Sequence, residues 1–137
     1  MIGLTSRHKR EDVALAISAS RSVLDDVKTY VKRSGLPIRR IVSASVPEPG
    51  ARGVLNGAHA LELALKLERK ISSRSTEERE GVLHIFVAAP NTFVFFLGQL
   101  AKGFGKVQLY EHAHGSEKVA EYRPSMRLPP IVQDIPE

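Results

Sequence analysis

The chain has 137 residues, 42% hydrophobic and 26% charged, which is enough to fold as a single domain, residues 1–137, around a hydrophobic core. It has no cysteine, which excludes disulfides and thiolate metal sites, and it has no apolar run long enough to span a bilayer. The first residues lack the features of a signal peptide, so we expect a cytoplasmic protein with no membrane partner. The net charge of +5 favours an anionic partner such as a nucleotide.

Strand and helix patterns alternate in the first part of the chain. Residues 12–19 form a continuous apolar run of the kind found in buried parallel strands. The next segment is a helix, in which Ser22 followed by Asp25 gives an N-terminal capping signature and Gly35 is suited to the C-cap. Residues 38–46 are predicted to be the second strand.

The same alternation continues in the second part. Apolar residues at helical spacing predict a helix over 56–71, and the charged segment after it predicts a loop. Residues 82–89 are predicted to form the third strand, 92–102 the third helix and 106–112 the fourth strand.

The segment 121–130 contains prolines and is suited to a short edge strand. Strands that alternate with helices predict an α/β, Rossmann-like fold. Its sheet should be open and mainly parallel, with helices on both faces.

The junction at Pro90, Asn91 and Thr92 separates an apolar strand from an apolar helix. Proline tolerates the first turn of a helix, and asparagine is a good N-cap. In open parallel sheets, ligands bind beyond the carboxyl ends of the strands, where helix N-termini present free N–H groups. We therefore predict a ligand site at this edge. For the phenylalanines that follow, packing in the core is favoured over contact with a partner chain.

The predicted ligand-binding residues all follow or close the strands at this edge. They offer hydroxyls, amides, cations and an aromatic ring, a set that suits a nucleotide better than a metal or an acyl substrate. They are Ser18, Ser20, Arg21, Ser22, Arg52, Asn56, His59, Pro90, Asn91, Thr92, Tyr110 and Glu111. For Ser20 and Ser22, helix capping is as good an interpretation as ligand contact. For His59, a position on a solvated helix face is commoner than a ligand contact.

Catalytic motifs are missing from the sequence. There is no GxGxxG, no P-loop and no nucleophile elbow. His112 and His114 have no third ligand at metal-site spacing. We therefore predict no catalytic residue, metal or cofactor, and a ligand-binding regulatory module more than an enzyme.

Four segments resemble, in order, the C-terminal half of a SAVED domain. They are VALAISASRSVLDDVKTYV, NGAHALELALKLERKI, HIFVAAPNTFVFFLGQL and KVQLYEH…EYRPSMRLP. The most characteristic parts are the H-I-F-x-A-A-P strand end, the following helix with L-G, and the Y-E strand followed by Y-x-P. The resemblance extends from about Asp12 to Pro129. SAVED domains resemble two fused CARF-like, Rossmann-like units and sense cyclic oligonucleotides in bacterial CBASS and CRISPR antiphage systems.

The resemblance implies a sensor that binds a cyclic oligonucleotide and passes the signal, by assembly, to a separate effector. Helix N–H groups and Arg21 or Arg52 would contact phosphates, and Tyr110 would contact a base. Since the chain holds one CARF-like unit, a second unit, in a homo-oligomer or on a partner chain, is expected. Two alternatives stay open: a ring nuclease that degrades such a messenger, and a structural or adaptor subunit with a vestigial pocket.

Overall fold

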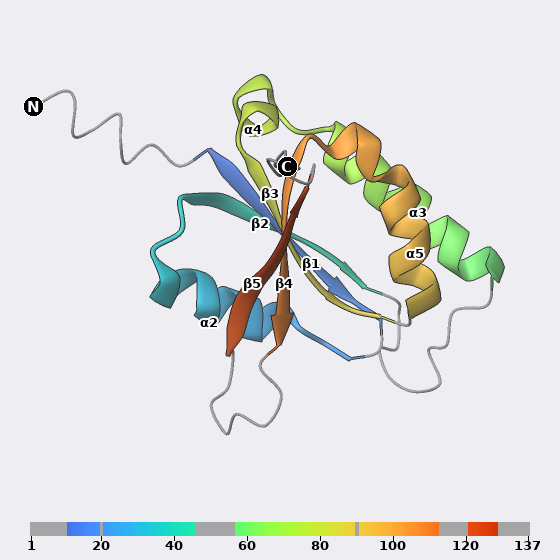
Figure 1. Cartoon of the computed structure of the whole chain (residues 1–137), viewed down its shortest axis with the longest axis horizontal. Helices are drawn as coiled ribbons and strands as arrows, with labels where there is room; N and C mark the ends of the chain where they lie inside the picture. Colours follow the sequence, from blue (N-terminus) through green and yellow to red (C-terminus); the bar gives the residue numbers. More distant parts are fainter. Residues whose placement is uncertain (1–10, 20, 46–56, 90, 113–120, 129–137) are drawn as a thin grey trace, which may run out of the picture.

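The fold is built on a five-stranded sheet with the strand order β2-β1-β3-β4-β5 (Figure 1). The computed structural model describes residues 11–19, 21–45, 57–89, 91–112 and 121–128. The strands are β1 (Asp12–Ser18), β2 (Ile38–Ser45), β3 (Val82–Ala88), β4 (Lys106–His112) and β5 (Tyr122–Leu128). The first four are parallel, and β5 pairs antiparallel with β4 at the edge. The predicted mainly parallel sheet and the predicted edge strand are both confirmed.

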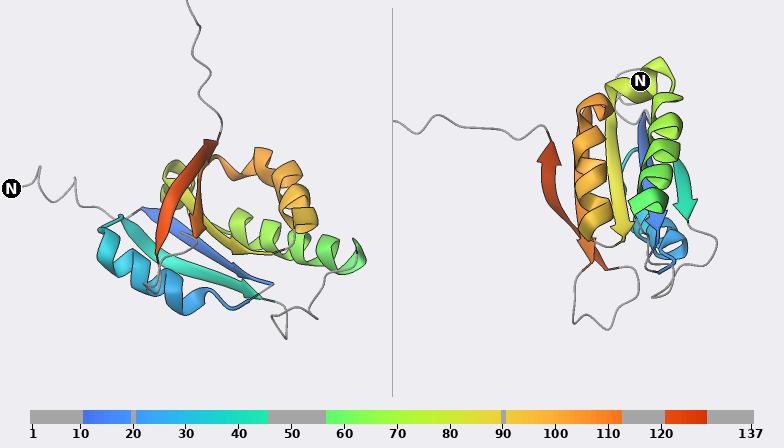
Figure 2. Two further views of the ribbon diagram at one scale, coloured as in Figure 1. Left: turned by 60° about the horizontal axis from the view of Figure 1, so that its bottom comes forward. Right: turned by 90° about the vertical axis from the view of Figure 1, so that its right-hand side faces the viewer.

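Helices cover both faces of the sheet, as predicted (Figure 2). One face carries α2 (Leu24–Ser34), and the other carries α3 (Gly57–Ser72) with α5 (Asn91–Leu100). The 3-10 helix η1 (Ala101–Phe104) continues α5, and the short helix α4 (Thr76–Glu80) precedes β3.

Strand β1, which lies between β2 and β3, is buried on both sides, which explains its uninterrupted apolar sequence. Val13, Leu15 and Ile17 belong to the core beneath α3 and α5. Ala14 and Ala16 belong to the core beneath α2. Successive side chains of a strand point to opposite faces, so a strand between two helix layers needs apolar residues at every position.

Helix α2 begins differently from the sequence prediction. Its N-cap is Val23, and no described side chain caps the helix, so the predicted cap at Ser22 is wrong. Val23 is buried and its N–H donates a 3.0 Å hydrogen bond to Ser18 Oγ at the end of β1. Burial of the valine therefore sets the start of the helix. The predicted C-cap is confirmed, because Gly35 has a left-handed φ of 72°.

The segment predicted as a charged loop contains helix α4. Ser75 and Glu78 form a capping box: Glu78 N–H donates to Ser75 Oγ (3.2 Å), and Ser75 N–H donates to Glu78 Oε1 (2.9 Å). The Glu78 carboxylate is buried and also accepts hydrogen bonds from Arg40 Nε (2.8 Å) and Nη2 (3.2 Å) on β2. The loop prediction was wrong because these tertiary bonds support a helix too short to show apolar periodicity.

Candidate functional site

The carboxyl ends of the parallel strands meet at one edge of the sheet, which is where the sequence predicts the ligand site. In the sheet register, Ser18 at the end of β1 lies beside Ser45 of β2 and Ala88 of β3. Ala19 N–H extends this contact with a 2.9 Å hydrogen bond to the Ala88 carbonyl. The chain returns from this edge into α2, α3 and α5 (Figure 1). We call it the carboxyl edge.

Four of the predicted site residues that the structure describes lie at this edge in different settings. Ser18 is buried, and its hydroxyl accepts the Val23 hydrogen bond described above. Arg21 and Ser22 are exposed, and Arg21 Nη1 lies 3.4 Å from Asp26 Oδ2 of α2. Glu111 is exposed and accepts a 3.1 Å hydrogen bond from Arg123 Nε. The positive charge of Arg21 is therefore partly neutralised by the carboxylate of Asp26.

Tyr110 lies in the core. Its ring stacks on Phe86 with 4.3 Å between centroids and an interplanar angle of 13°. Its hydroxyl lies 2.6 Å from His84 Nδ1. Burial raises the pKa of Tyr110 well above its ordinary value, so the phenol stays protonated. A base could stack on this ring only if the packing opened, so we assign it no ligand contact.

The other predicted residues are beyond what the structure describes. The side chains of His59, Asn91 and Thr92, which belong to α3 and α5, lie outside the described part. Four further residues lie outside the described residues altogether: Ser20, Arg52, Asn56 and Pro90. Their ligand contacts stay predictions.

Sequence reasoning missed Tyr122, which reaches the carboxyl edge from β5. Because β5 is antiparallel, its first residue pairs with His112, the last residue of β4. Tyr122 is only 9% exposed, and its hydroxyl has no hydrogen-bond partner among the described residues. The His112 ring lies edge-on to it at 5.4 Å. The return strand was predicted, but its direction, which brings Tyr122 here, was not.

A second group missed from the sequence is a buried polar chain under the α2 face. His84 Nε2 lies 2.7 Å from Asp12 Oδ2, and His84 Nδ1 contacts the Tyr110 hydroxyl. Asp12 Oδ1 accepts a 3.0 Å hydrogen bond from Val82 N–H. Asp12 and Val82 are the first residues of their strands, so the chain of bonds starts at the end opposite the carboxyl edge. Its position indicates a structural role. The sequence feature that indicates this group is the single histidine within the otherwise apolar strand VLHIFVA.

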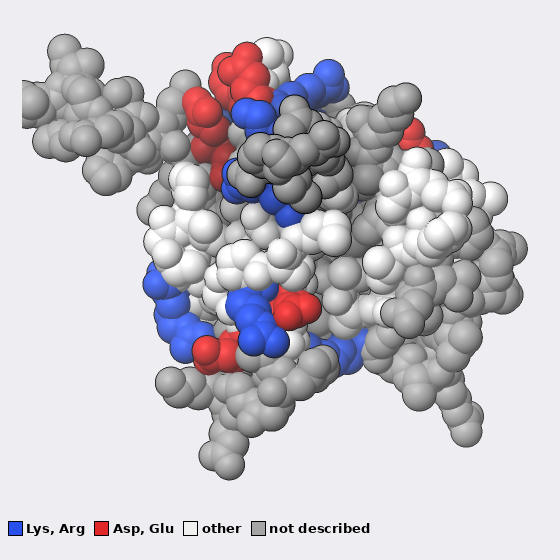
Figure 3. Space-filling model, in the orientation of Figure 1, with Lys and Arg blue, Asp and Glu red and all other residues white. Residues whose placement is uncertain are grey.

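An uncharged surface lies over α3 and α5 (Figure 3). Its exposed apolar side chains are Leu61, Leu65, Val94 and Phe95. The prediction of core packing for the phenylalanines is confirmed for Phe93, which is fully buried, and wrong for Phe95, which is 67% exposed. Phe96 has no described side chain. We call this surface the α3–α5 face.

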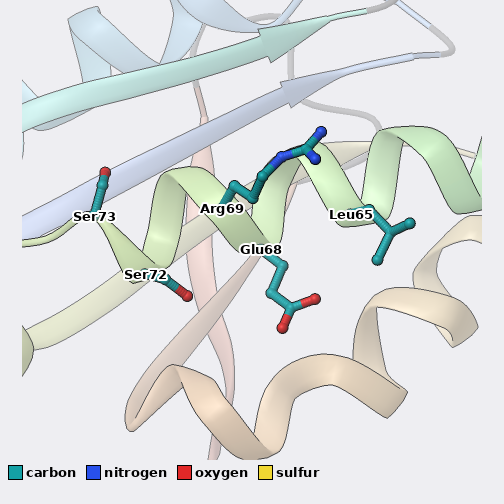
Figure 4. Close-up of a pocket in the computed structure, with 5 residues that line it drawn as sticks. All are labelled: Leu65, Glu68, Arg69, Ser72 and Ser73. Carbon is teal, nitrogen blue, oxygen red and sulfur yellow. The ribbon is translucent and has the colours of Figure 1, made fainter.

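A hollow of about 450 Å³ lies along α3 beside this face (Figure 4). It is lined by Leu65, Glu68, Arg69, Ser72 and Ser73. Most of these residues lie toward the C-terminal end of α3, away from the carboxyl edge. Glu68 and Arg69 carry opposite charges, so the hollow offers an anion no net attraction.

The described part of the chain contains neither a candidate metal site nor a helix suited to span a membrane. No group of three His, Asp or Glu side chains there is placed to hold a metal ion. None of the described helices combines the length and the apolar character needed to cross a membrane.

The sheet topology and the helices on both faces define a Rossmann-like α/β domain. Comparison with known proteins identifies the family. The sequence profile of the SMODS-associated and fused to various effectors sensor domain, SAVED, matches residues 2–128. The chain belongs to the SAVED family.

A curated relative and two solved structures support this membership. The chain is 31% identical over 118 residues to CD-NTase-associated protein 4 of Enterobacter hormaechei subsp. hoffmannii (strain UCI 50), covering 85% of this chain and 23% of the relative. It is similar to the Acinetobacter baumannii Cap4 SAVED/CARF-domain containing receptor solved with the cyclic trinucleotide 3'3'3'-cAAA (TM-score 0.58, 17% identity, 85% and 23% coverage). It is also similar to the Moraxella osloensis Cap4 SAVED/CARF-domain containing receptor (TM-score 0.50, 21% identity, 85% and 21% coverage).

The chain thus spans about a quarter of the length of these relatives. At 17% and 21% identity, the likeness to the solved receptors concerns the fold.

Proposed function

We propose that this chain is a sensor unit that binds a cyclic oligonucleotide at the carboxyl edge and signals, by assembly, to a separate effector in antiphage defence. The observation that carries the proposal is the SAVED match over residues 2–128. A related Cap4 receptor has been solved with a cyclic trinucleotide, which supports this ligand class. We further infer that the chain corresponds to the C-terminal half of a SAVED domain and acts in the cytoplasm.

The helix starts at this edge differ in what they offer an anion. Helices α3 and α5 have no acidic residue in the first turn, so their dipoles favour a phosphate nearby. Helix α2 carries Asp25 and Asp26 in its first turn, and Asp26 pairs with Arg21. We therefore place the phosphates of the ligand toward α3 and α5, and an uncharged part of the ligand toward α2.

The first experiment is a thermal-shift screen of this chain against cyclic di-, tri- and tetranucleotides, including 3'3'3'-cAAA. A ring at about 100 times its dissociation constant adds roughly 2.7 kcal/mol to the free energy of unfolding, which raises Tm visibly. We expect a shift that is selective for one ring, with the linear trinucleotide as the control. If no ring raises Tm, the sensor proposal is wrong.

The same samples separate the two alternatives. Chromatography of the ring after incubation would reveal linear products if the chain were a ring nuclease. An adaptor subunit would form a stable oligomer that responds to none of the nucleotides.

We also propose that the α3–α5 face packs against a second copy of this chain. The four side chains that define the face, Leu61, Leu65, Val94 and Phe95, are apolar, so two copies can bury them against each other without charge repulsion among them. Both helices start at the carboxyl edge, so pairing through them would bring two ligand edges close together. A ligand that touched both edges would stabilise the assembled state.

Replacing Phe95 with glutamate is therefore expected to weaken self-association by about tenfold or more, because it buries a charge at the contact. Sedimentation velocity with and without the bound ring would measure this. Met126→Glu is the matched control, since Met126 is also an exposed large apolar residue but lies on β5, away from this face. Equal association of the Phe95 variant and the parent would refute the interface.

A further inference from the structure

Tyr122 stands out at the carboxyl edge because a buried hydroxyl normally has a hydrogen-bond partner. This hydroxyl is enclosed, and its one polar neighbour among the described side chains that acts on it as a donor is Arg21, which lies too far or too obliquely for a hydrogen bond of ordinary geometry but close enough to oppose the rise that burial causes in the pKa of Tyr122. Replacing such a hydroxyl by hydrogen removes a desolvated polar group, which is neutral or stabilising unless the group has a partner in another state. The ligand-free fold therefore leaves this buried hydroxyl with no more than a weak contact to Arg21.

The surroundings of the Tyr122 hydroxyl supply both hydrogen-bond donors and acceptors. Burial raises the pKa of Tyr122, and the Arg21 guanidinium beside it opposes this, whereas Asp26 raises the pKa further. The phenol stays protonated and can donate. Arg21 offers further donors, and the Asp26 carboxylate, 3.4 Å from Arg21 Nη1, offers acceptors.

The charges at this place favour an uncharged ligand group over a phosphate. The Arg21–Asp26 pair has no net charge, and Asp25 in the same helix turn adds a negative charge. A phosphate would meet repulsion from both carboxylates. The edge of a nucleobase, by contrast, carries donors and acceptors side by side and no charge.

We propose that Tyr122, Arg21 and Asp26 form a subsite that reads the hydrogen-bonding edge of one nucleobase. The inference rests on the proposed function, because it assigns one part of the cyclic oligonucleotide to one part of the carboxyl edge. Arg21 is exposed and can turn aside, which admits the base edge to the Tyr122 hydroxyl. The subsite selects among bases, and the phosphates are held elsewhere, toward α3 and α5.

The test is Tyr122→Phe, which removes one oxygen and keeps the ring. We expect the Tm of the ligand-free protein to stay the same or rise. Affinity for the preferred ring should fall about three- to tenfold, the effect of one lost hydrogen bond. Affinity for a ring of the same size with another base should fall less, so selectivity drops, while the dependence of affinity on salt stays unchanged.

Tyr30→Phe is the matched control, because Tyr30 packs edge-on against Tyr122 at 5.7 Å and receives the same chemical change. Its affinities should equal those of the parent. The probes are 3'3'3'-cAAA, its all-guanine and all-uracil counterparts, and the corresponding cyclic dinucleotides and tetranucleotides.

Four results would overturn the inference. A lower Tm of ligand-free Tyr122→Phe with unchanged affinity would make the hydroxyl structural. An equal loss for every ring, with a weaker salt dependence, would make it a phosphate contact. Binding of no ring by the parent would overturn the proposed function as well, whereas parent binding that Tyr122→Phe leaves intact overturns the base subsite alone.

Discussion

Replacing His84 with leucine is expected to lower the free energy of unfolding by about 3–5 kcal/mol, the largest effect we predict for a single substitution. His84 is buried and joins two other polar groups, the partly buried Asp12 carboxylate and the Tyr110 hydroxyl in the core. Leucine fills similar space but offers no hydrogen bond. The Tyr110 hydroxyl would then lie in the core unsatisfied, and the Asp12 carboxylate, whose side chain is only 13% exposed, would keep the Val82 N–H but lose its partner at Oδ2.

The chemistry of the three groups explains why they belong together. In the tautomer that carries its proton on Nε2, His84 donates to Asp12 Oδ2 and accepts from the Tyr110 O–H at Nδ1, so one imidazole ring can serve both partners. The space is closely fitted as well: a Cβ on Gly81 would lie 2.6 Å from Asp12 Oδ1. This series of hydrogen bonds links β1, β3 and β4 on the face that α2 covers.

Urea unfolding of four proteins would measure the expected coupling: the parent, His84→Leu, Tyr110→Phe and the double variant. Once His84 is absent, removal of the Tyr110 hydroxyl should cost little, because that hydroxyl has already lost its partner. The double variant should therefore be more stable than the sum of the two single effects predicts. Additive effects would show that the two side chains do not act as a unit.

The sequence predicts what depends on local patterns. The apolar run at 12–19 indicates a strand buried on both faces, and Gly35 marks the end of α2. Both follow from side-chain alternation and from the left-handed conformation that glycine tolerates. The start of α2 was misjudged because burial of Val23 outweighed the capping preference of Ser22. Local preferences of this kind give way to packing when the two conflict.

Contacts between segments that are distant along the chain could not be predicted from the sequence. Tyr110 was predicted as a ligand residue because it lies near the end of a strand. Its burial depends on Phe86, which stacks on it from the neighbouring strand. Tyr122 reaches the carboxyl edge only because β5 runs antiparallel to β4. Strand order and direction decide both outcomes, and a single sequence does not specify them. The sequence therefore predicted at which edge of the sheet the candidate site lies. It predicted only some of the residues that lie there.

Glu78→Gln is expected to lower the free energy of unfolding by about 2 kcal/mol at neutral pH, because Arg40 loses a charged partner. This figure is already reduced for solvent screening, since the Arg40 side chain is 44% exposed. Glutamine keeps the side-chain oxygen of the capping box with Ser75, so the change tests the ion pair. Glu80→Gln, on the exposed side of the same helix, is the control and should have little effect.

Acid should remove this difference between the parent and Glu78→Gln. The hydrogen bond from Arg40 is the main cause that lowers the pKa of Glu78 from 4.5 to about 2 in the folded protein. Because the folded pKa is the lower one, the stabilisation is fully present above pH 4.5 and is lost as the pH falls toward about 2. Urea unfolding at several pH values between neutral and about 2.5 would measure it. A gap between parent and variant that stays constant over this window would mean that Glu78 stabilises the fold through packing and not through its charge.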